Sequence, residues 1–126
     1  MGASAKDLED FYKSPSSGTK AASDNEYNLL GQISGELKIA YDNRVSKYPE
    51  LVEAVTRNSL LWTIFAAEAA DQRNGLSEEI RAKIFWLAQY VDLESKNVLR
   101  ELSGAENLIE INKCIMRGLR ESSASI

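Results

Sequence analysis

Apolar residues recur at steps of three and four positions in four successive segments, and this spacing restricts the possible folds more than any other feature. A repeat of that kind places an apolar stripe along one side of an α-helix. The stripes consist of Tyr27, Leu30, Ile33, Leu37, Tyr41 and Val45; Leu51, Val55, Asn58, Trp62, Phe65 and Ala69; Ile80, Ile84, Leu87, Val91, Val98 and Leu102; and Leu108, Ile111, Asn112, Ile115 and Leu119. We therefore expect an all-α protein without strands.

Capping and turn residues separate these four segments. Ser23 and Glu26 match a capping box at the start of the first helix. Pro49 fits the first turn of the second helix, and Ser77 fits the N-cap of the third. Because short connections favour antiparallel neighbours, the sequence predicts a small four-helix up-and-down bundle.

The chain of 126 residues is expected to form one domain with a tail at each end. Residues 1–22 are small and polar, with Ser, Gly and Pro at their centre, and predict a flexible, mobile N-terminal segment. Residues 23–120 carry the four stripes and predict the helical domain. Residues 121–126 are expected to be a short C-terminal tail.

The overall charge and the single cysteine limit the environment and the partners. A net charge of −4, with basic residues scattered along the chain, argues against direct nucleic-acid binding, because such binding needs positive charge gathered on one face. The sequence contains no run of about 20 apolar residues that would cross a membrane, and its start lacks the apolar core of a signal peptide. One cysteine fits a reducing compartment, so a cytoplasmic protein without membrane contacts is expected.

Residue types that usually carry catalysis are scarce. The sequence has no histidine, which removes the commonest general base and the commonest metal ligand. Cys114 has no histidine partner and is expected to act as a small apolar residue. Neither facing carboxylates nor a glycine-rich phosphate loop is recognisable. We therefore expect no enzymatic activity, no catalytic residue, no cofactor and no metal.

The two middle helices have apolar residues outside their main stripes. These residues are Leu60 and Ile64 in the second helix, and Ala82, Trp86, Tyr90 and Leu93 in the third. One interpretation is that a middle helix touches two neighbours. The other is a groove that receives an amphipathic helix of another protein, with Trp86 as its most important residue.

Two asparagines interrupt the inner stripes. Asn58 lies between Val55 and Trp62, and Asn112 lies between Leu108 and Ile115. A buried amide without a hydrogen bond costs about 1–3 kcal/mol. Both are therefore expected to be structural polar residues of the core, each bonded to a backbone carbonyl or a polar side chain of a neighbouring helix.

Three stretches together resemble the FlaF family of flagellar biosynthesis regulators. They are NSLLWTIF at 58–65, NGLSEEIRAKI at 74–84 and LIEINKCIMRGLR at 108–120. The positions that match that family's pattern are Asn58, Leu61, Trp62, Phe65, Asn74, Leu76, Arg81, Leu108, Ile109, Glu110, Ile111, Asn112, Gly118 and Leu119. Ser77 stands where the family often has proline. The resemblance covers residues 27–120, and nothing is carried over to the first 22.

The resemblance implies a non-enzymatic cytoplasmic protein of flagellated bacteria. Such proteins resemble flagellin-specific secretion chaperones that help couple flagellin synthesis to export, acting with a second regulator, FlbT. Flagellin is therefore the expected partner. Two alternatives stay open: a direct RNA-binding post-transcriptional regulator of flagellin mRNA, and a helical structural protein whose outer apolar rows pair with copies of itself.

Overall fold

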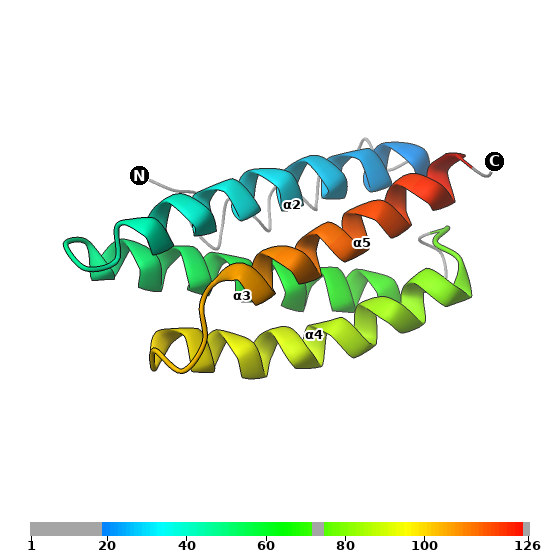
Figure 1. Cartoon of the computed structure of the whole chain (residues 1–126). Coiled ribbons are helices and arrows are strands. Elements are labelled where there is room, and N and C mark those ends of the chain that lie inside the picture. Colours follow the sequence, from blue (N-terminus) through cyan, green and yellow to red (C-terminus); the bar gives the residue numbers. More distant parts are fainter. Residues whose placement is uncertain (1–18, 72–74, 125–126) are drawn as a thin grey trace.

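A computed structural model of the protein describes residues 19–71 and 75–124. Its four helices are α2 (Thr19–Asp42), α3 (Tyr48–Ala70), α4 (Glu78–Leu99) and α5 (Glu106–Ala124), and the described residues contain no strand. Each helix packs against the next one along the chain, and α5 returns to pack against α2. Successive helices run in opposite directions (Figure 1), so the predicted four-helix up-and-down bundle is confirmed.

The inner stripes form the core of this bundle. Leu30, Phe65, Ile84 and Ile115 are fully buried representatives of the four helices. The apolar positions of α3 and α5 that the spacing predicts are all buried. Trp62 packs against Phe65 with ring centroids 5.6 Å apart, an aromatic contact in the tilted geometry that such rings prefer.

Two predicted core residues are exposed, because the helices end before them. Val45 lies in the connection between α2 and α3 and is 94% exposed. Leu102 follows the end of α4 and is 71% exposed. Once the chain leaves the helix, the 3.6-residue period no longer decides which side a residue faces.

The helices also extend beyond the predicted domain limits. Helix α2 begins at Thr19, so Ser23 lies inside it and the predicted capping box is wrong. Lysine and alanine at positions 20–22 are good helix formers, which accounts for the earlier start. Helix α5 continues through Ala124, past the predicted end at residue 120. Most of the N-terminal segment predicted to be flexible, residues 1–18, lies outside the described residues, and so do residues 125–126.

The predicted start of α4 is confirmed. Ser77 is its N-cap, and its hydroxyl oxygen accepts a hydrogen bond of 3.2 Å from the backbone N–H of Ile80. Glu78 and Glu79 occupy the first turn, where the positive end of the helix dipole favours them. Gly75 precedes this start with a φ of 79°, a value that glycine adopts at little cost.

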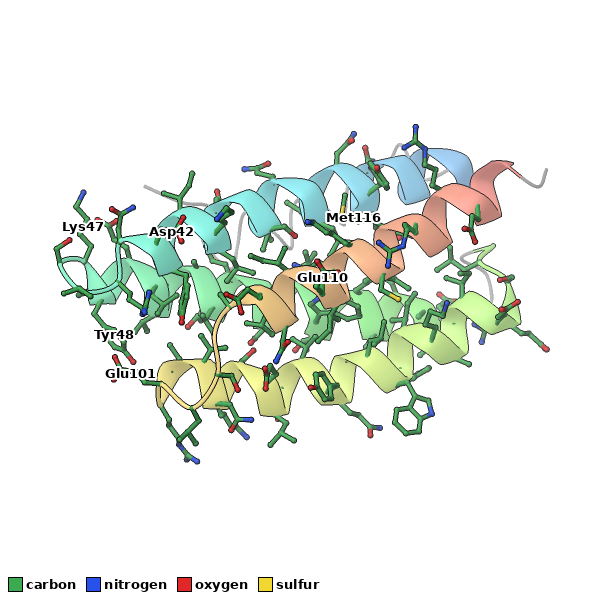
Figure 2. All side chains as sticks on the ribbon, viewed as in Figure 1. Asp42, Lys47, Tyr48, Glu101, Glu110 and Met116 are labelled. Atoms are coloured by element: carbon green, nitrogen blue, oxygen red, sulfur yellow. The ribbon has the colours of Figure 1, made fainter. Side chains whose placement is uncertain are left out.

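The end of α4 is a Schellman motif built on a glutamate. Glu101 has a φ of 61°. Its N–H donates to the carbonyl of Val98, and the N–H of Leu102 donates to the carbonyl of Asn97. Glu101 lies at the same end of the bundle as Tyr48 (Figure 2), whose hydroxyl donates to the carbonyl of Leu99.

Replacing Glu101 with glycine is expected to raise the free energy of unfolding by about 1 kcal/mol. Glycine adopts positive φ without steric cost, which stabilises the folded protein. This stabilisation exceeds the loss in free energy of unfolding that arises because glycine gives the unfolded chain more conformational entropy. Glu101→Ala is the matched control, because it removes the same charge but keeps the strained conformation. Urea unfolding followed by circular dichroism measures both. Equal stability of the two variants would contradict a backbone origin of the effect.

Candidate functional site

The outer side of α4 carries a row of exposed large apolar side chains. Phe85, Trp86, Tyr90 and Leu93 are 44%, 79%, 47% and 59% exposed, and Ala82 is also exposed. We call these five residues the α4 face. The opposite side of α4 buries Ile80, Ile84, Val91 and Val98 in the core. Because 100° separates successive residues of a helix, the α4 face points away from the bundle.

The α4 face brings together four of the six predicted partner-binding residues: Ala82, Trp86, Tyr90 and Leu93. The other two, Leu60 and Ile64 on α3, are partly buried and pack against the hydrophobic core. This placement agrees with the interpretation in which a middle helix touches two neighbours. Phe85 was missed, because it belongs to neither of the two rows that the sequence suggested.

The α4 face has the composition of a protein-binding surface. Tryptophan and tyrosine dominate the energetics of such interfaces, and adjacent large apolar residues are uncommon on the surface of a monomer. Charged residues border it: Lys96 and Asp92 form an exposed ion pair of 3.3 Å. An apolar centre with a polar border is what a partner's amphipathic helix requires.

A hydrogen-bonded network in the centre of the bundle links three helices. The side-chain oxygen of Asn112 on α5 accepts from the Trp62 indole N–H at 2.7 Å. Its amide nitrogen donates to Asn58 Oδ1 on α3 at 2.8 Å and to Ser34 Oγ on α2 at 3.0 Å. The Ser34 hydroxyl in turn donates to the carbonyl of Leu30 at 2.7 Å. Both asparagines are fully buried, and each bonds a polar side chain of a neighbouring helix.

A second buried polar group was missed from sequence. Glu94 on α4 is 4% exposed. Its carboxylate accepts from the side-chain amides of Asn107 at 2.6 Å and Asn97 at 3.2 Å, and from the Ser103 hydroxyl at 3.4 Å. The bonds from Ser103 and Asn107 attach the end of α4 to the connection and to the first turn of α5. The sequence contained a sign of this burial. The apolar stripe of α4 has no apolar residue between Val91 and Val98, and Glu94 occupies the inner position between them.

Glu26 on α2 is a buried acid of a different kind. It is 6% exposed, and within the described residues its Oε2 has no hydrogen-bond partner. Burial, reinforced by the negative charge of Glu68 on α3, raises the pKa of Glu26 to about 8. Glu26 precedes Leu30 by one helical turn, which places it on the inner side of α2.

Chemical groups for catalysis or metal binding do not converge in the described part of the chain. No cluster of three or more His, Cys, Asp or Glu side chains that could hold a metal ion occurs among these residues. Cys114 is half-buried and unpaired on α5. A helix long and apolar enough to span a membrane is also missing from the described segments.

Comparison with known proteins identifies one family. The model of the family described as flagellar protein FlaF matches residues 9–119. This range contains the first two stretches that carry the sequence resemblance and the third up to Leu119, and it begins 18 residues before the expected start at residue 27. No curated protein and no solved structure matches the chain.

Proposed function

This chain belongs to the FlaF family of flagellar proteins, and from that premise we propose that it is a non-enzymatic, cytoplasmic chaperone that binds flagellin. In this role it would couple flagellin synthesis to secretion during flagellum assembly, together with the regulator FlbT. The observation that carries the proposal is the α4 face, which exposes Trp86, Tyr90 and Leu93 on a helix whose other side is fully packed.

The α4 face suits the task of covering an apolar helix before export. Ala82, Trp86, Tyr90 and Leu93 follow one another at three- and four-residue steps, with Phe85 beside Trp86, so a partner helix laid beside α4 can contact them in turn. Each Å² of apolar surface removed from water contributes about 25 cal/mol. The binding segment of flagellin is therefore expected to be amphipathic, with its apolar side on the α4 face. We also expect the complex to survive moderate salt, because salt weakens interactions between charges and apolar contact dominates here.

Size-exclusion chromatography with light scattering, applied to this protein mixed with monomeric flagellin, tests the proposal. The expected result is a one-to-one complex that survives moderate salt. A homodimer that forms without flagellin, and no complex with it, would instead favour self-association through the α4 face. Binding to flagellin mRNA that falls steeply with added salt would favour the RNA-binding alternative, which the net charge of −4 disfavours.

Trp86→Ala is expected to weaken flagellin binding by at least ~2 kcal/mol, about 30-fold in Kd, without changing the helix content. Trp86 is 79% exposed in the free protein, so its removal does not disturb the core. Leu102→Ala is the matched control, since Leu102 is similarly exposed but lies beyond the end of α4. Isothermal titration calorimetry measures both. A larger loss with Leu102→Ala than with Trp86→Ala would place the interface elsewhere.

A further inference from the structure

A stripe of exposed residues with the spacing of a coiled coil runs along the outer side of α4. Its members are separated by three and four positions in alternation, and they are Glu79, Ala82, Trp86, Gln89, Leu93 and Lys96. We call this stripe the α4 seam. All six side chains are exposed, and α4 lies at an edge of the bundle (Figure 1), so the seam faces outward. Because a seam with this spacing packs against another helix, its spacing indicates a helix as the occupant.

The two ends of the α4 seam carry opposite charges. Glu79 lies in the first turn of α4, and Lys96 lies in the last turn. Lys96 also forms an ion pair with Asp92 at 3.3 Å, but these side chains are 60% and 73% exposed. Such exposed pairs contribute little to stability and are easily replaced. A helix that binds antiparallel to α4 should therefore have a basic residue near Glu79 and an acidic residue near Lys96.

Helix α4 itself has the sequence that such a partner helix requires. When the α4 seams of two copies lie antiparallel around a common midpoint, each residue of the first half faces one of the second half. The facing pairs are Glu79 with Lys96, Ala82 with Leu93, and Trp86 with Gln89. In a parallel arrangement, Glu79 would face Glu79 and Lys96 would face Lys96, and like charges repel. The charges therefore favour a second copy in the antiparallel direction, with twofold symmetry.

We propose that, without flagellin, the α4 seam pairs with the α4 seam of a second copy in an antiparallel dimer of twofold symmetry. Ala82, Trp86 and Leu93 belong both to this seam and to the α4 face, so the second copy and a flagellin helix exclude one another. Dimerisation therefore regulates access to the α4 face. The regulatory part of this inference rests on the proposed function, whereas the dimer itself does not.

The size of the contact makes this dimer weak. Helix α4 has 22 residues, so it is about 33 Å long, and one helix covers a strip about 10 Å wide, roughly 330 Å² on each copy. Stable interfaces bury about 1,200–2,000 Å² in total. The dimer is therefore expected to form only as the protein concentration rises, which allows flagellin to displace the second copy.

Analytical ultracentrifugation of the full chain alone, over a range of concentrations, tests the dimer without flagellin. The natural chain is expected to pass from monomer to dimer. Glu79→Lys and Lys96→Glu should each weaken the dimer about tenfold, because symmetry turns two attractive contacts into repulsive ones. An equal mixture of these two variants should restore about the natural affinity, since each charge then faces its opposite. Glu110→Lys and Lys113→Glu, on the exposed side of α5, are matched controls and should leave the dimer unchanged.

Two results with the chain alone would overturn the proposal. One is a monomer at every concentration. The other is a dimer that the charge variants and their mixture leave unchanged, because its interface would lie elsewhere. Added flagellin should convert the dimer into the one-to-one complex, and a complex that contains two copies of this protein would overturn the mutual exclusion. A dimer with the expected charge pattern that binds no flagellin would support the pairing and refute only the proposed function.

Discussion

Asn112→Ala is expected to lower the free energy of unfolding by about 4 kcal/mol, because one substitution removes a partner from three buried groups. The Trp62 indole loses its acceptor, and Asn58 and Ser34 lose a donor. Asn112 is fully buried, so water does not replace these bonds. Urea unfolding monitored by far-ultraviolet circular dichroism measures the loss.

Two further variants make this result specific. Asn43→Ala is the matched control: Asn43 is exposed at the end of α2 and donates one hydrogen bond to the carbonyl of Ile39, so its loss should cost less than about 1 kcal/mol. The double variant Asn58→Ala/Asn112→Ala is expected to be more stable than the sum of the single effects predicts, since neighbouring polar groups are coupled. A loss below 1 kcal/mol for Asn112→Ala would mean that the network contributes little.

Glu26→Gln is expected to remove a decline in stability that the natural chain shows as the pH rises from about 4.5 to about 8. The pKa of Glu26 is about 8 in the folded protein and 4.5 without the surroundings of the fold. Between these values the unfolded chain releases a proton that the folded chain keeps. The stabilising contribution of the protonated acid is therefore fully present below pH 4.5 and is lost as the pH increases through 8.

A pKa difference of this size corresponds to about 4 kcal/mol at pH 8. Glutamine has a similar shape and stays neutral, so the stability of Glu26→Gln minus that of the natural chain should increase by about this amount across the window. Glu68→Gln should reduce the pH dependence in part, because the charge of Glu68 is the second cause of the raised pKa. With Glu110→Gln, an exposed control, the difference should stay flat. Urea unfolding at four or five pH values measures these curves, and a flat difference for Glu26→Gln would refute the raised pKa.

The sequence predicted the inner sides of the helices well, because burial of apolar residues must follow the helical period. The same reasoning found Asn58 and Asn112, since a polar residue inside an apolar stripe has to be buried with it. Helical spacing did not show that the two amides bond to each other. Their helices are far apart in sequence, and the spacing within one helix contains no information on how two helices align.

The missed residues share a different cause. Glu26 and Glu94 occupy inner positions, but a charged residue on a helix usually faces water, and only the tertiary structure brings Glu68 or Asn107 beside them. The ion pair between Arg57 and Glu36 was equally hidden, because its two residues lie on different helices. The outer row of α4 could be anticipated, since large apolar residues on both sides of one helix exceed what its neighbours can cover.

The two tryptophans of the chain lie in opposite surroundings, and this gives the protein two separate optical signals. The indole of Trp62 is buried and hydrogen-bonded to Asn112, whereas that of Trp86 is surrounded by water. Indole emits at shorter wavelengths in apolar surroundings than in water. Fluorescence of Trp62 therefore reports whether the bundle is intact, and a blue shift of Trp86 reports whether α4 is covered, so folding and binding can be followed in one unlabelled sample.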